Sequence, residues 1–117
     1  MQTFTYSSNV TLTVTQNDNA LTCFLNPDSP LNKWVKVYDQ HQSNMGTAAK
    51  TTADLTPYLN DMLNPGDSTA FSAVASNFIG GGQMTFTVTI DGSVALNVNT
   101  ALNTYTSEQW AITIKRA

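Results

Sequence analysis

The stretch MTFTVTIDGSVALNV, residues 84–98, decides the fold class of this chain. Apolar side chains alternate with threonines over its first seven residues, a period-two pattern typical of a strand with one buried and one exposed face. Asp91-Gly92 follows, and this pair is preferred in type I′ hairpin turns. Apolar residues then return at every second position: Val94, Leu96 and Val98. The stretch therefore predicts an antiparallel β-hairpin whose apolar face continues onto the return strand.

The same alternation recurs along the chain. It predicts further strands over residues 2–6, 10–15, 20–25, 33–39, 69–76 and 110–114. Together with the hairpin this makes about eight strands, separated by turn signals and without a helical crossover. Such a set favours an all-β fold, an antiparallel two-sheet β-sandwich that is jelly-roll-like and forms a single domain over residues 1–117.

The connections are predicted from their turn residues. Asn17-Asp18-Asn19 predicts a hairpin loop, because Asn and Asp tolerate a left-handed φ. Residues 40–53 carry no strong period and are expected to form a long loop. Thr56-Pro57 predicts one short helical turn near residues 57–63, with Leu59, Met62 and Leu63 facing inward. The type II turn pattern of residues 64–67 closes it.

Charge and hydropathy exclude several classes of partner. The chain of 117 residues has five Lys plus Arg and a net charge of −3, so it cannot form a basic stripe for nucleic acid. No apolar run approaches the roughly 20 residues of a membrane-spanning helix. The polar N-terminus does not have the pattern of a secretory signal. We expect a soluble protein synthesised in the cytoplasm, with its final location open.

Residues for catalysis or metal binding are scarce. Cys23 has no second cysteine to pair with, and its phase with Leu21 and Leu25 predicts a small core residue. His41 is the only histidine, so no nucleophile–base set can be assembled, and we expect neither an enzyme nor a cofactor. Most aspartates occupy turn positions. No metal site is predicted, although calcium binding by the Asn/Asp loops stays open.

Aromatic residues suggest a binding surface. If Val35 and Val37 face the core, Trp34 and Tyr38 project together from the outer face of one strand. Such a pair offers a flat apolar platform with polar edges, on which a sugar ring can settle. Further contacts are expected from the loop and turn that follow, at His41, Tyr58 and Asn60. The alternative is that Trp34 and Tyr38 pack under the 40–53 loop or in a contact between subunits.

Two resemblances accompany this interpretation. Residues 54–59 followed by 64–67 resemble a loop-to-strand segment of galactose-binding-like jelly-roll modules, over little more than a tenth of the chain. The acidic, Asn- and Thr-rich composition is similar to that of small microbial and fungal lectins. The hypothesis is therefore a lectin-like module that binds a glycan or glycoconjugate and forms a homo-oligomer.

Two other functions stay open at this level. Threonine rows on the predicted sheet faces and the low charge are compatible with a structural, self-assembling subunit of an oligomer, coat or inclusion. Exposed Trp34 and Tyr38 are also compatible with a small membrane-surface-binding or pore-forming protein.

Overall fold

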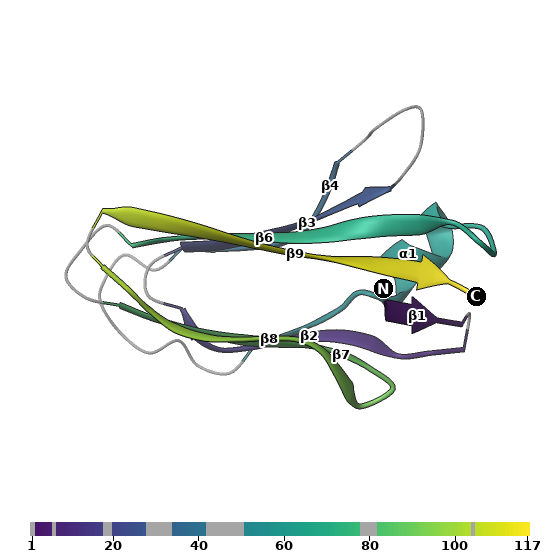
Figure 1. The fold of residues 1–117 in the computed structure, drawn as a ribbon, viewed down its shortest axis with the longest axis horizontal. Helices are drawn as coiled ribbons and strands as arrows, with labels where there is room; N and C mark the ends of the chain where they lie inside the picture. Colours follow the sequence, from purple (N-terminus) through teal and green to yellow (C-terminus); the bar gives the residue numbers. More distant parts are fainter. Residues whose placement is uncertain are drawn as a thin grey trace.

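The computed structural model describes residues 2–5, 7–17, 20–27, 34–41, 51–77, 82–103 and 105–117. Two β-sheets pack face to face in it (Figure 1). Sheet A has the strand order β1-β9-β6-β3-β4, and sheet B has the order β5-β2-β7-β8. The elements are β1 Gln2–Phe4, β2 Val10–Asn17, β3 Ala20–Pro27, β4 Val35–His41, β5 Thr51–Asp54, α1 Thr56–Met62, β6 Ser68–Asn77, β7 Gly82–Ile90, β8 Ser93–Leu102 and β9 Thr106–Arg116.

The predicted all-β two-sheet sandwich is confirmed, with nine strands in place of about eight. The additional strand is β5, which begins in the segment 40–53 that was predicted to be a loop and pairs with β2. Among the described strands, only the pairs β3–β4 and β7–β8 are consecutive in the sequence and in the same sheet; the other consecutive strands lie in different sheets. This wrapping is typical of jelly-roll sandwiches. The prediction that residues 17–19 form a hairpin loop is wrong, because β2 and β3 lie in different sheets and do not pair with each other. Asp18 and Asn19 themselves lie outside the described residues.

The β7–β8 hairpin forms as predicted, with one change in its return strand β8. Asp91 and Gly92 have φ of 50° and 81°, as the type I′ turn requires. A bulge at Ala95 follows, since Thr89 pairs with Val94 whereas Val88 pairs with Leu96. The extra residue aligns Leu96 with the inward Val88, whereas Val94 pairs with the outward Thr89 and is 61% exposed. The expectation that Val94 continues the apolar face is therefore wrong.

The core lies between the sheets and is built from the inward positions of nearly every strand. Phe86 of β7 and Trp110 of β9 meet there edge to face, with ring centroids 5.5 Å apart, so this contact joins the two sheets. The largest fully buried side chains are Phe4, Phe71, Phe86, Leu12, Leu21, Leu25, Leu55, Leu59, Met84, Leu102, Ile114 and Val10. The alternation in the sequence thus predicts most of the side chains that form the core.

The short helix α1 lies beside the chain termini (Figure 1). Leu59 and Leu63 are buried and Met62 packs against the core, as predicted. Thr56 does not cap the helix with its side chain; its Oγ1 accepts the N–H of Val10 at 2.9 Å instead. Arg116 donates to the Leu63 carbonyl and so ties β9 to the helix end. Within the described residues, no helix has the length and apolarity needed to cross a bilayer.

Candidate functional site

A bulge in β4 separates the two aromatic residues that were expected to act together. Cys23 of β3 pairs with Tyr38, whereas Phe24 pairs with Lys36, so Val37 is an extra residue in β4. Because side chains alternate along a strand, one extra residue reverses the faces beyond it. Tyr38 therefore faces inward like Cys23. The expectation that Trp34 and Tyr38 share one outer face is wrong.

Tyr38 connects the two sheets. Its hydroxyl donates to Gln40 Oε1 and lies 3.0 Å from Thr51 Oγ1 on β5, which belongs to sheet B. The ring packs against the core, and this burial raises the pKa of the Tyr38 hydroxyl. The alternative that Trp34 and Tyr38 pack under the 40–53 loop falls mostly on residues 42–50, which lie outside the described residues. Tyr38 stabilises the fold and is not an exposed platform.

Trp34 stays on the outer face of sheet A. It immediately precedes β4, half of its surface is exposed, and its ring meets that of Phe24 edge to face at a centroid distance of 5.7 Å. The ring of Phe24 fixes the position of this exposed indole, which lowers the conformational entropy that a ligand contact would have to remove. Phe24 was not anticipated as a site residue. Its outward position follows from the inward phase of Leu21, Cys23 and Leu25.

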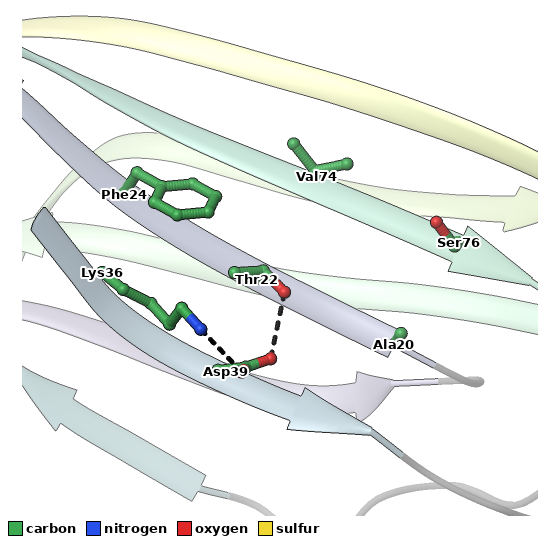
Figure 2. Close-up of a pocket in the computed structure, with 7 residues that line it drawn as sticks. All are labelled: Ala20, Thr22, Phe24, Lys36, Asp39, Val74 and Ser76. Atoms are coloured by element: carbon green, nitrogen blue, oxygen red, sulfur yellow. Dashed lines mark hydrogen bonds and ion pairs between the residues drawn. The ribbon is translucent and has the colours of Figure 1, made fainter. Parts of the chain in front are cut away.

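A groove of about 390 Å³ lies on the same outer face, across β3, β4 and β6 (Figure 2). Part of β3 and β4 rises above the plane of β6 and β9, so the sheet is curved here (Figure 1). Small side chains on β3 and β6 leave room between the larger ones of Phe24 and Lys36. The lining residues are Ala20, Thr22, Phe24, Lys36, Asp39, Val74 and Ser76.

One wall of the groove carries an ion pair that depends on the bulge. Lys36 Nζ lies 3.2 Å from Asp39 Oδ2, and Thr22 Oγ1 donates to Asp39 Oδ1 at 3.1 Å (Figure 2). In a regular strand residues i and i+3 face opposite sides, so Lys36 and Asp39 could not meet. The extra residue Val37 brings both to the outer face. The groove therefore combines a carboxylate, an ammonium group and hydroxyls beside an aromatic pair.

Tyr38, Tyr58 and Asn60 are not among the residues that line this groove. Tyr58 and Asn60 lie on α1, where Tyr58 is exposed and the Asn60 carbonyl is 3.4 Å from Arg116 Nη1. His41 ends β4 opposite Ala20, but its side chain lies outside the described residues. Of the four predicted residues whose side chains the structure describes, Trp34 alone lies beside the groove, through its contact with Phe24.

Cys23 is a core residue, as its phase predicts. It is fully buried on the inner face of β3, and burial raises the pKa of its thiol to about 12. Such a thiol stays protonated at neutral pH and is a poor nucleophile or metal ligand. Among the described residues, no group of three His, Cys, Asp or Glu side chains could hold a metal ion.

Comparison with known proteins adds no relative. No family model, no curated protein and no solved structure matches this chain. Its function has to be argued from the groove and the surfaces described above.

Proposed function

We propose that the protein is a non-enzymatic, lectin-like module that binds a glycan or glycoconjugate at the outer groove of sheet A. The half-exposed Trp34, fixed by Phe24 at the edge of a groove with a charged wall, is the observation that carries the proposal. Sugar rings combine apolar C–H faces with hydroxyl groups. An aromatic ring next to fixed polar groups complements both parts.

The polar wall offers both kinds of hydrogen-bonding group. The carboxylate of Asp39 accepts hydrogen bonds at two oxygens, and Lys36 and the Ser76 hydroxyl donate, while the Thr22 hydroxyl, which donates to Asp39, can accept. Thr22 and Lys36 hold the carboxylate in place, so little reorganisation is needed when a ligand hydroxyl approaches. The groove volume of about 390 Å³ falls within the ~300–1,000 Å³ typical of small-ligand sites.

Trp34→Ala is expected to reduce glycan binding about 5- to 30-fold, because removing one aromatic contact costs roughly 1–2 kcal/mol. Asp39→Asn is expected to weaken binding through loss of the charged acceptor while the strand pairing persists. A glycan array identifies the ligand, and isothermal titration of the purified variants measures the change. Circular dichroism confirms that each variant keeps the sheet content of the wild type.

Two further variants locate the site. Tyr105→Asn removes an aromatic ring that is 84% exposed in the β8–β9 turn, and asparagine tolerates its φ of 61°. This variant should bind like the wild type. Loss of binding in Tyr58→Ala, with Trp34→Ala unaffected, would place the site on α1 and overturn the groove. If the protein bound no glycan on a broad array, carbohydrate recognition would be overturned. The same would follow if it bound phosphatidylcholine vesicles without glycan as tightly as it bound glycans.

A further inference from the structure

The outer edge of β8 carries an unused set of backbone hydrogen-bonding groups. β8 is the last strand of sheet B and pairs with β7 on one side only; across the described ranges, no strand pairs with its other side. About half of the N–H and C=O groups of an edge strand point away from the sheet. Such an edge is a template for another strand.

This edge lacks the features that protect the other sheet edges. None of the ten residues of β8 is charged and none is proline. By contrast, β4 carries Lys36 and Asp39, β5 has four residues and ends in Asp54, and β1 has three residues. The part of β9 that β1 leaves uncovered, residues 106–113, contains Glu108. The bulge at Ala95 interrupts only the start of β8, so residues 96–102 form a regular, uncharged edge.

The core is also incompletely covered along this side of the sandwich. Leu96 of β8 and the inward side chains Trp110 and Ile112 of β9 pack against the core but remain partly exposed. β8 and β9 contact each other across the sheets, so these three side chains lie on the same side of the sandwich. A strand added beside β8 would cover apolar surface and satisfy the backbone groups together.

We infer that the occupant is β8 of a second copy, paired antiparallel about a two-fold axis. Two identical uncharged edges meet without charge repulsion in any register, whereas β4 carries the Lys36–Asp39 ion pair, and charged side chains protect an edge strand from pairing. A two-fold axis makes the pairing self-complementary and closed, because each edge satisfies the other. The pairing continues sheet B from one copy into the next, with the outward Asn97 and Asn99 of both copies on one surface. This interface is on the opposite sheet from the glycan groove and does not depend on the proposed function.

Ala101→Lys tests the edge, because Ala101 is exposed on the outer face of β8 and a lysine there protects an edge strand. Analytical ultracentrifugation of the wild type over a range of concentrations should show a monomer–dimer equilibrium. The variant should dissociate with a Kd raised at least about tenfold. Thr52→Lys is the matched control: it adds the same charge to the same sheet surface, but on the β5 edge, and should dimerise like the wild type.

Hydrogen exchange provides the second measurement. In the wild type, amides of residues 96–102 should gain protection as the protein concentration rises, while those of β4 and β5 should not. A wild type that stays monomeric at all concentrations would overturn the inference. So would dimers that survive Ala101→Lys without protection in β8, or an open series of higher oligomers, which a two-fold contact cannot produce.

Discussion

Replacing Phe86 with alanine is expected to lower the free energy of unfolding by about 3–5 kcal/mol, a large part of the about 5–15 kcal/mol typical of a domain. Phe86 is fully buried in the central strand β7, and its ring contacts Trp110 in the opposite sheet at 5.5 Å between centroids. The substitution removes apolar burial and leaves a cavity between the sheets, where the backbone of neither sheet can close the gap. Urea denaturation followed by circular dichroism measures the loss.

Phe24→Ala is the matched control, since it makes the same change on the outer face of sheet A. Phe24 is only partly buried and borders the groove, so its removal should cost less than about 2 kcal/mol. In a Trp34→Phe background, where Trp110 is the single tryptophan, fluorescence should shift on Phe86→Ala and stay unchanged on Phe24→Ala, because Phe86 contacts Trp110 whereas Phe24 contacts Trp34. Equal destabilisation by both substitutions would contradict a core located between the two sheets.

The period of two was sufficient to predict the strands and most of the core. Phe86, Val88 and Val98 alternate with polar neighbours, so a strand that turns these neighbours to solvent turns the three apolar side chains to the core. The turns were predictable for a similar reason: Asp91 and Gly92 adopt positive φ where the type I′ turn requires it. Sheet membership was not predictable, because local alternation does not say whether β2 pairs with β3 or crosses to the other sheet.

The candidate site was less predictable because it depends on one bulge. Alternation through Val35-Lys36-Val37-Tyr38 assumes a regular strand, and the extra residue Val37 reverses the assignment of Tyr38. A signal for the bulge is present in retrospect. Lys36 and Asp39 are three residues apart, so a regular strand would turn one of these charges toward the core, at a high desolvation cost. The bulge lets both charges face solvent while Tyr38 reaches Thr51.

Raising the pH from 9 to 11 is expected to lower the free energy of unfolding by about 2 kcal/mol through the Cys23 thiol alone. Burial raises the pKa of this thiol from 9.0 to about 12. Above pH 9 the unfolded chain releases the proton while the folded protein retains it, so each further pH unit favours unfolding. Below pH 9 the thiol is protonated in both states and contributes no pH dependence. The raised pKa of Tyr38 adds a loss of the same sign above pH 10.

Cys23→Ala isolates the thiol, because it removes the titrating group and leaves a small apolar side chain in the core. At pH 7 this variant should be less stable than the wild type by about 1 kcal/mol, through lost packing. Its stability should fall more slowly with pH, so the two curves should cross between pH 9 and 11. Urea denaturation in reducing buffer over pH 7–11 measures both curves. Parallel curves would mean that the thiol ionises as readily in the folded protein as in the unfolded chain, and that Cys23 does not lie in a closed core.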